Sequence, residues 1–236
     1  MGEHGEVAII IPAYNEAEVL GGTIQGMQMA LKRAKIKAEI IVVDDKSTDA
    51  TAEVARETGA TVISHVLNLG AGGATSTGLR YAKIMDLDIA VTMDADGQHL
   101  AKDVIAGIKK MQSGSIDLLI GSRLLKPEGM SKSKKLGNRG LSLITAVLFG
   151  VYVTDSQSGL RLFSKNALQH LEWKSAGYEF CSEMIWRTRQ AKMKIAEYPI
   201  KAVYTDYSRS KGQNNWNGVN IVKSLFKQRL EEVIEW

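Results

Sequence analysis

The chain of 236 residues is poor in cysteine, proline and aromatic residues, with one cysteine, three prolines and 6% aromatics. The single cysteine, Cys181, excludes an internal disulfide and a zinc site built from several cysteines. The longest apolar run, Leu141–Val153, is shorter than the about 20 residues that a membrane-spanning helix takes. The short polar start, residues 1–6, does not resemble a signal peptide. We therefore expect a cytoplasmic protein.

The charge of the chain is only mildly unbalanced. It has 30 basic and 26 acidic residues, a formal net charge of +4, and its 44% apolar and 24% charged residues are typical of a globular protein. The basic excess fits an anionic ligand or a membrane surface, and we expect no nucleic-acid partner. The sequence shows no internal repeat and no long linker. We therefore expect a single domain over residues 1–236.

The first half of the chain alternates between short apolar segments and helical patterns. This alternation predicts an α/β fold with a mostly parallel, doubly wound sheet. Ligands bind such sheets at the carboxyl ends of the strands, so the polar residues that follow the strands should meet at one edge. The expected strands are Val7–Ala13, Ala38–Val43, Ala60–His65, Asp88–Met93 and Asp117–Gly121. The expected helices run to about Ala34, Thr58 and Lys83, with a fourth at Ala101–Gln112.

The pattern changes after Ser122. The sequence predicts a loop, an apolar helix, a strand with a polar approach, another helix, one or two strands, a polar loop and an amphipathic C-terminal helix. These segments are Leu125–Lys135, Gly137–Tyr152, Asp155–Phe163, Glu179–Ala191, Ile195–Tyr204, Asp206–Asn217 and Val219–Ile234.

The acidic cluster Asp94–Gln98 follows the fourth expected strand. Asp94 and Asp96, one residue apart and followed by Gln98, offer the hard oxygen ligands that suit Mg²⁺ or Mn²⁺. The plainer interpretation is a solvated turn. His99, next to the cluster, is either an outer neighbour of the metal ligands or a surface residue.

Two further loops at this edge have two interpretations each. The Gly-rich stretch Asn68–Gly73 either holds phosphate at a helix N-terminus or packs that helix tightly on the sheet. Asp44 and Asp45 either contact a nucleoside or begin a helix. We favour the nucleoside, because Ser47–Asp49 already supply caps for that helix and leave the Asp pair without a structural role.

Basic side chains near the same edge fit a diphosphate ligand. Arg123 follows the fifth strand, Arg139 begins the apolar helix and Arg161 lies in the segment after it. Such side chains would clamp a diphosphate beside the metal, although any one arginine is more often a solvated surface residue. Arg209 and Lys211, in the late polar loop, would close over a bound nucleotide.

Seven motifs carry a resemblance to a known family: IIIPAYNE, VVDDKSTDAT, NLGAGGA, DADGQH, GSR, GNRG and DSQSGLR. In this order they resemble the glycosyltransferase family 2 enzymes, and within them the polyprenyl-phosphate branch typified by dolichol-phosphate mannose synthase. The resemblance implies a Rossmann-like GT-A fold. It also implies metal-dependent, inverting transfer of a hexose from a nucleotide sugar, of the GDP-mannose or UDP-glucose type, to a polyprenyl or dolichyl phosphate.

The resemblance also implies roles for individual residues. Residues 7–123 would bind the nucleotide sugar and the metal, and residues 124–211 would form the acceptor side. Asp96, Arg123 and Asp155 are the catalytic candidates. By motif, Pro12, Tyr14, Glu16, Val43, Asp45 and Gly70 would hold the nucleoside, Asp94, Asp96 and Gln98 the metal, and Arg123, Arg139, Arg209 and Lys211 the phosphates. The chain departs from many relatives at Ala71, where they have Lys or Gln.

The nature of the acceptor decides whether a general base is needed. A phosphate monoester has a second pKa of about 6 and is already ionised near neutral pH. A sugar hydroxyl would need a carboxylate base, for which Asp155, Glu179 and Glu183 are candidates unless they have structural roles, such as holding Arg161. A non-catalytic nucleotide-sugar-binding module stays open. A sugar-1-phosphate nucleotidyltransferase is disfavoured because Pro12–Glu16 lacks a Gly-rich basic motif.

Two helices are candidates for contact with a lipid surface. The apolar run Leu141–Val153 follows Lys132, Lys134 and Lys135, and the C-terminal helix carries Lys223, Lys227 and Arg229. Basic amphipathic helices of this kind bind membrane interfaces, and the alternative is ordinary core packing. We favour core packing for both helices, and peripheral membrane association or a membrane partner subunit stays open.

Overall fold

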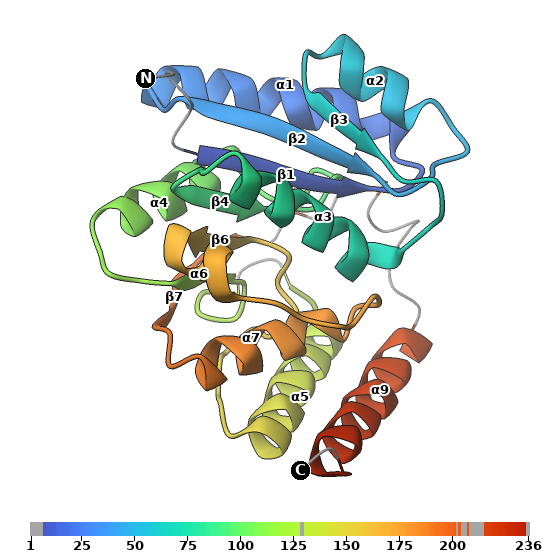
Figure 1. The fold of residues 1–236 in the computed structure, drawn as a ribbon, viewed down its shortest axis with the longest axis vertical. Coiled ribbons are helices and arrows are strands. Elements are labelled where there is room, and N and C mark those ends of the chain that lie inside the picture. The colour runs from blue at the N-terminus through green and yellow to red at the C-terminus, as the bar shows by residue number, and fades with distance from the viewer. Residues whose placement is uncertain (1–6, 128–129, 202, 204–206, 208–214, 235–236) are drawn as a thin grey trace.

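A computed structural model describes residues 7–127, 130–201, 203, 207 and 215–234. The described chain forms one seven-stranded sheet of order β3-β2-β1-β4-β6-β5-β7, covered by helices (Figure 1). The strands are β1 (Val7–Ala13), β2 (Ala38–Asp44), β3 (Thr61–Ser64), β4 (Ile89–Thr92), β5 (Leu118–Ser122), β6 (Arg161–Ser164) and β7 (Ile195–Pro199). The helices are α1 (Ala17–Ala34), α2 (Thr51–Glu57), α3 (Gly70–Ile84), α4 (Ala101–Gln112), α5 (Lys132–Phe149), α6 (Lys165–His170), α7 (Phe180–Gln190) and α9 (Asn215–Ile234).

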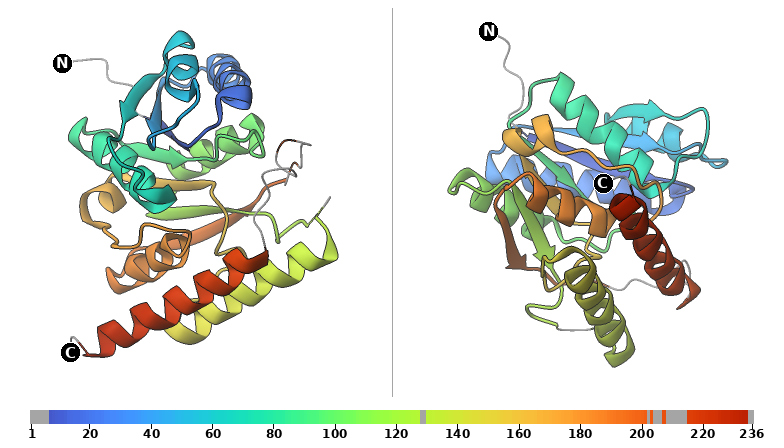
Figure 2. Two further views of the ribbon diagram at one scale, coloured as in Figure 1. Left: turned by 90° about the vertical axis from the view of Figure 1, so that its right-hand side faces the viewer. Right: turned by 60° about the horizontal axis from the view of Figure 1, so that its bottom comes forward.

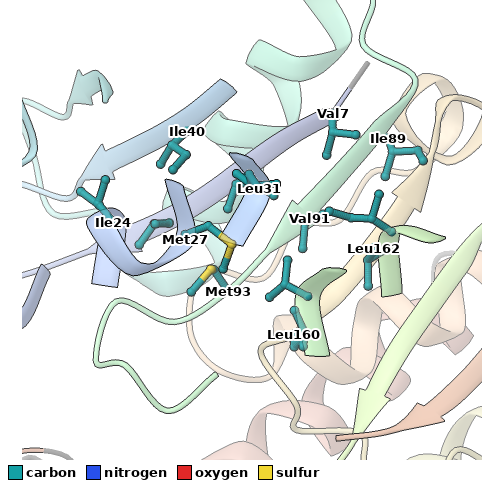
Figure 3. Packing of buried hydrophobic residues seen from close by; sticks show 14 of the residues in the cluster. Val7, Ile24, Met27, Leu31, Ile40, Ile89, Val91, Met93, Leu160 and Leu162 are labelled. Carbon is teal, nitrogen blue, oxygen red and sulfur yellow. The ribbon is translucent and has the colours of Figure 1, made fainter. Parts of the chain in front are cut away.

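The first four strands form the parallel half of the sheet, as the alternation of strands and helices predicts. β1 pairs in parallel with β2 on one side and β4 on the other, and β3 adds to β2. β1 is buried on both faces, which explains its unbroken apolar sequence. Ile9 belongs to the core under α1 and α4, whereas Ile10 belongs to the core under α3. Figure 3 shows Met27 and Val91 in the first of these cores.

The other half of the sheet contains a strand of opposite direction. β6 lies between β4 and β5 and is antiparallel to both, whereas β7 is parallel to β5. Because β6 is antiparallel, it begins where β4 ends, with Arg161 opposite Thr92. The loop that precedes β6 therefore reaches the edge that the carboxyl ends of β1, β2 and β4 form.

Several element bounds differ from the predictions. The expected strand Asp155–Phe163 is extended only from Arg161, and helix α6 was not predicted. Helix α5 begins at Lys132, inside the expected loop Leu125–Lys135, because Ser131 accepts a hydrogen bond from the Lys134 N–H. The expected loop Asp206–Asn217 lies mostly outside the described residues, and its last three residues belong to α9.

The expected side-chain cap of α2 is also absent. Its N-cap is Ala50, and no side chain caps this helix at that position. Asp49 instead accepts hydrogen bonds from the backbone N–H groups of Thr51 and Ala17, at 3.0 and 3.2 Å. It therefore ties the start of α2 to the start of α1.

Helices α5 and α9 lie side by side at the end of the molecule opposite α1 and α2 (Figures 1 and 2). Phe149, Trp186, Ile221 and Leu225 form the apolar cluster that joins these two helices to α7. Among the described residues, no helix combines the length and the apolar character needed to cross a membrane.

Candidate active site

The loops after β1 and β2 are joined by hydrogen bonds at the carboxyl edge of the sheet. The N–H of Asn15 donates to Ser47 Oγ at 2.9 Å, and the N–H of Glu16 donates to Thr51 Oγ1 at 2.8 Å. Tyr207 donates its hydroxyl hydrogen to Glu16 Oε2 at 2.7 Å. These contacts fix the loop that carries Tyr14 and Glu16. Pro12 and Val43, the other two predicted nucleoside residues of these strands, are opposite each other in the β1–β2 register.

Both carboxylates of the Asp pair have structural roles. Asp45, which is buried, accepts hydrogen bonds from the N–H groups of Leu69 and Gly70, both at 2.8 Å, and contacts His65 Nδ1 at 2.7 Å. Asp44 accepts a hydrogen bond from the Ser47 N–H at 3.1 Å. The expectation that this pair lacks a structural role was wrong, and the nucleoside role of Asp45 stays a prediction.

The Gly-rich stretch packs a helix rather than leaving its first amides open. Helix α3 begins at Gly70, and the Gly72 N–H donates to the Ala176 carbonyl at 2.7 Å. A Cβ at Gly72 would lie 2.4 Å from the Ser175 carbonyl oxygen, so only glycine permits this approach. Together with the bonds to Asp45, this contact supports the packing interpretation of residues 68–73.

Asp94, at the end of β4, is held beside a buried histidine. His99 Nε2 lies 2.9 Å from Asp94 Oδ2, so His99 is an inner neighbour of the acidic cluster and not a surface residue. Desolvation by the surrounding protein on its own raises the pKa of Asp94. The charges of His99, Arg123 and Arg161, together with the His99 hydrogen bond, outweigh this effect and hold the pKa below its usual value.

Asp96 points toward the same region. Its carboxylate accepts hydrogen bonds from Gln98, from the backbone N–H at 3.0 Å and from the side-chain amide. Desolvation and the nearby charge of Asp94 raise the pKa of Asp96. Two carboxylates that oppose each other's ionisation gain from a cation between them.

This donor set fits a hard divalent cation. Mg²⁺ takes one or two protein carboxylates and completes its shell with water and substrate phosphates, which matches Asp94, Asp96 and Gln98. The described residues contain no group of three or more His, Cys, Asp or Glu able to hold a metal ion, so a zinc-type site is not formed there. A Cβ at Gly159 would lie 2.4 Å from Asp94 Oδ1, so this glycine leaves room for the carboxylate.

Arg123 and Asp155 form a pair at the end of β5. Arg123 Nε and Nη2 donate to the two oxygens of Asp155 at 2.7 and 2.8 Å, and the Arg123 N–H donates to the same carboxylate at 3.1 Å. Asp155 is fully buried. It therefore holds Arg123, and not Arg161 as the sequence suggested. This arginine is close enough to Asp94 to lower its pKa.

Two other charged candidates are structural. Arg161 is only 1% exposed and donates to the carbonyls of Ser156, Ser158 and Cys181, so it is not part of a diphosphate clamp. Glu183, fully buried, accepts hydrogen bonds from the N–H groups of Lys174 and Ser175 and from Arg187 Nε. Neither Glu183 nor Asp155 is therefore placed to act as a general base, which leaves Glu179 from the three candidates.

The structure does not test all of the remaining predicted phosphate contacts. Arg139 is exposed on α5, and Arg209 and Lys211 lie outside the described residues. Gly159 lies in the motif DSQSGLR, but the motif alone indicates no role for it. The fixed positions of Asp155 and Gly159 at the carboxyl edge follow from the direction of β6, which the sequence pattern does not report.

A groove of about 450 Å³ adjoins the acidic cluster and is lined by Thr23, Asp96, His99 and Tyr207 among others. A larger hollow of about 600 Å³ lies at the opposite edge of the sheet, around Lys37, and contains none of the candidate residues. Size therefore does not identify the site, and the chemistry of the side chains does.

The chain belongs to glycosyl transferase family 2, whose model matches residues 8–172. It is 38% identical to the UDP-N-acetylglucosamine–dolichyl-phosphate N-acetylglucosaminyltransferase of Methanococcus voltae, over 97% of this chain and 98% of that relative. It is 30% identical to the undecaprenyl-phosphate mannosyltransferase of Micrococcus luteus, over 87% of this chain and 86% of that relative.

The fold matches solved structures as well. Glucosyl-3-phosphoglycerate synthase from Mycobacterium tuberculosis, in complex with phosphoglyceric acid, superposes with a TM-score of 0.73 at 20% identity, over 96% of this chain and 79% of that chain. The predicted GT-A fold and the predicted family are thus confirmed, and the chain is a glycosyltransferase.

Proposed function

We propose that the chain transfers a sugar from a nucleotide sugar to the phosphate of a polyprenyl lipid. The observation that carries this proposal is that the loop before β6, which contains Asp155 and Gly159, reaches the carboxyl end of β4, where Gly159 packs against Asp94 and Asp155 holds Arg123. Acidic oxygen ligands and an arginine in one place suit a reaction between phosphate groups. The names of the two relatives, both acting on polyprenyl-type phosphates, support the class of acceptor.

The structural roles of two candidate bases also favour a phosphate acceptor. Asp155 and Glu183 both hold other groups, whereas a phosphate monoester is ionised without help because its second pKa is about 6. A sugar hydroxyl would depend on Glu179, which is half-buried and accepts a hydrogen bond from the Gly177 N–H at 3.3 Å. The hydroxyl acceptor is thus the second candidate function, and Glu179 is the residue that tests it.

The reaction is a single in-line displacement at the anomeric carbon. An acceptor phosphate oxygen forms the new bond, the bond to the nucleoside diphosphate breaks, and the configuration at the carbon inverts. Asp94, Asp96 and Gln98 would hold Mg²⁺ or Mn²⁺, which supplies charge neutralisation for the departing diphosphate when bound. Arg123, oriented by Asp155, donates hydrogen bonds to phosphate oxygens that gain charge in the transition state.

The donor is a UDP- or GDP-sugar. The β1 and β2 loops would hold the nucleoside through Tyr14 and Glu16, and the hydrogen bonds between these loops pre-order the pocket. The Methanococcus voltae relative, which uses UDP-N-acetylglucosamine by its name, makes that sugar the first donor to test.

The test is transfer of radiolabel into the organic phase. Purified protein is offered UDP-N-acetylglucosamine, UDP-glucose or GDP-mannose, each labelled in the sugar, with a short-chain polyprenyl phosphate and with Mn²⁺ or EDTA. We expect transfer from one donor in Mn²⁺ and none in EDTA. Tight donor binding without transfer to the lipid would contradict the proposal. Transfer to a hydroxyl group of a sugar acceptor that Glu179→Gln abolishes would establish the hydroxyl acceptor instead.

An exposed apolar row on α5 would bring the enzyme to its lipid acceptor. Leu136, Leu143 and Val147 lie on one face of this helix and are 75%, 59% and 76% exposed. The neighbouring α9 exposes Phe226 and Leu230. Exposed apolar rows beside basic side chains favour binding to an anionic lipid surface. The basic side chains are Lys132, Lys134, Lys223, Lys227 and Arg229, all exposed.

Liposome flotation tests this part of the proposal. We expect the protein to float with vesicles that contain anionic lipid at low salt, and the variant Leu143→Glu/Val147→Glu to stay in the bottom fraction. Ile84→Glu is the matched control, because Ile84 is 71% exposed at the end of α3, away from this face. Flotation of the double variant equal to wild type would exclude the α5 row.

A further inference from the structure

Glu197 on β7 joins the two loops that hold Arg123, although it lies outside the motifs of the family. β7 is parallel to β5, with Glu197 opposite Ile120, three residues before Arg123. The two carboxylate oxygens of Glu197 accept the Thr154 N–H, both at 2.9 Å, and one accepts the Thr154 hydroxyl at 2.7 Å. The loop before β6 is thus fixed to β7 at the residue next to Asp155.

The hydroxyl groups of Thr154 and Ser122 continue from Glu197 as a series of hydrogen bonds with a defined direction. Thr154 gives its only hydroxyl hydrogen to the Glu197 carboxylate, so Ser122 must be the donor in its 2.6 Å contact with Thr154 Oγ1. Ser122 Oγ in turn accepts the Leu124 N–H at 3.2 Å. Every hydrogen bond in this series therefore points toward the Glu197 carboxylate, and an ionised acceptor at its end strengthens the series.

This series of hydrogen bonds fixes the backbone on both sides of Arg123. Ser122 and Leu124 flank the arginine, and Thr154 precedes its partner Asp155. The Arg123–Asp155 pair is bidentate, with additional bonding from the Arg123 N–H, so a small shift of either loop would break its alignment. A bidentate pair transmits orientation far better than a single contact does.

We propose that Glu197 is a positioning residue that sets the direction of the Arg123 guanidinium through Thr154, Ser122 and Asp155. This proposal rests on the proposed function of Arg123 as a donor to phosphate oxygens. Glu197 touches neither the donor nor the acceptor. Its carboxylate orders the loops, and Asp155 passes that order to the arginine.

The test is a double-mutant cycle on label transfer to polyprenyl phosphate. We expect Glu197→Ala to lower kcat/KM about 10- to 100-fold, as is usual for residues that orient a functional side chain. In the Arg123→Ala background the same change should have no further effect, because the arginine that it orients is gone. Equal losses in both backgrounds would overturn the proposal.

One conservative variant and one control variant separate this role from an effect on general stability. Thr154→Val keeps the backbone N–H but removes the hydroxyl, and we expect it to lower transfer partially. In the Arg123→Ala background the same change should have no further effect. Glu39→Ala is the matched control, since Glu39 on β2 also accepts two side-chain hydrogen bonds, from Thr61 at 2.6 Å and Tyr81 at 2.9 Å. It should lower the melting temperature and leave kcat/KM within about twofold, because these two part-buried hydrogen bonds lie away from the candidate site.

The cycle also distinguishes its own failure from failure of the proposed function. If wild-type protein transfers no sugar to polyprenyl phosphate, the proposed function fails. The cycle is then run on the affinity for UDP with Mn²⁺, which needs no acceptor. Weaker binding in Arg123→Ala and Glu197→Ala, without additivity in the double variant, would still support the positioning role. Unchanged binding in Glu197→Ala beside weakened binding in Arg123→Ala would overturn it.

Discussion

The two halves of the sheet fix their functional side chains in different ways. In the parallel half, the carboxyl ends of β1, β2 and β4 bring their loops together. Ser47 and Thr51 link the loops after β1 and β2 by accepting hydrogen bonds from the backbone N–H groups of Asn15 and Glu16. In the other half, the reversed strand β6 brings a loop to the same edge, and the buried side chains of Arg161 and Asp155 hold it. A third buried charge, Glu183, holds the backbone of Lys174 and Ser175.

This difference has a consequence for specificity. The topology of parallel strands already brings their loops to one edge, so many sequences are compatible with that placement. A loop held by buried ion pairs and hydrogen-bonded carboxylates has few arrangements that satisfy every charge. We therefore expect the parallel half to tolerate change better, and the β6–β5–β7 half to determine how Arg123 faces the acceptor.

The largest expected effect is loss of transfer in Asp96→Ala. Removing this carboxylate takes away a proposed metal ligand and the partner of Gln98, and we expect kcat to fall about 10²- to 10³-fold. The measurement is label transfer over a Mn²⁺ titration. Asp49→Ala serves as the comparison, since Asp49 also accepts backbone N–H groups at this edge but outside the acidic cluster. Full activity of Asp96→Ala would contradict the proposal that Asp96 holds a metal needed for transfer.

The second effect tests the buried charges of the other half. Glu183→Ala leaves the N–H groups of Lys174 and Ser175 and the Arg187 guanidinium without this acceptor, which we expect to cost about 3 kcal/mol of unfolding free energy. Urea denaturation measures it. Glu179→Ala, one turn earlier, should cost less than about 1 kcal/mol. Equal costs for the two variants would show that Glu183 is not the structural carboxylate.

The third effect arises where the two halves touch. In Gly159→Ala the new Cβ would fall 2.4 Å from Asp94 Oδ1, so the carboxylate must move, and we expect about 10- to 100-fold weaker Mn²⁺ activation. Gly26→Ala in α1, where a Cβ meets nothing within 4 Å, is the control and should gain about 0.5–1 kcal/mol of stability. A Gly159→Ala enzyme with unchanged metal activation would show that the β6 loop does not constrain Asp94.

The smallest effect concerns pH and the opposite edge of the β6–β5–β7 half. Desolvation raises the pKa of Asp117, but hydrogen bonds from Asn166, the Lys194 N–H and Ser164 outweigh it and lower the pKa below its usual value. Ionised Asp117 therefore stabilises the fold above its unfolded pKa of about 3.9, and this contribution disappears as the pH falls through the lower folded pKa.

The variant Asp117→Asn tests this sign. We expect wild type to be more stable than the variant by about 1 kcal/mol at pH 7, with the difference vanishing near pH 2. Chemical denaturation at several pH values measures it. A difference that stays constant from pH 7 to pH 2 would exclude the carboxylate charge as its origin.

The parallel half was largely predictable from the sequence. In the other half β5, β7 and α7 were predicted close to their observed bounds, but the start and the direction of β6 were not. Apolar runs such as Val7–Ala13 report buried strands, and the rule for carboxyl ends then places Asp94 and Tyr14 at one edge. The direction of β6 leaves no mark in its apolar pattern, because a strand reads the same in either direction. The partner of Arg123 and the importance of Gly159 depend on that direction.

The roles of the buried charged residues were the second feature that could not be predicted from the sequence. Nothing in the local pattern of Arg161 or Glu183 distinguishes an internal group from a surface one, since both stand among apolar and polar neighbours alike. The same holds for Asp45, whose partners Leu69 and Gly70 come from a distant loop. Long-range hydrogen bonds decided these roles, and only the three-dimensional structure contains them.

The most direct test of a shared active site is label transfer to polyprenyl phosphate by Arg123→Ala, measured beside Asp96→Ala and wild type with Mn²⁺ present. If both halves act on the same diphosphate and acceptor, each variant should lose at least about 100-fold in kcat/KM while remaining folded. Transfer by Arg123→Ala at the wild-type rate would contradict that claim, because the second half would then contribute no catalytic group.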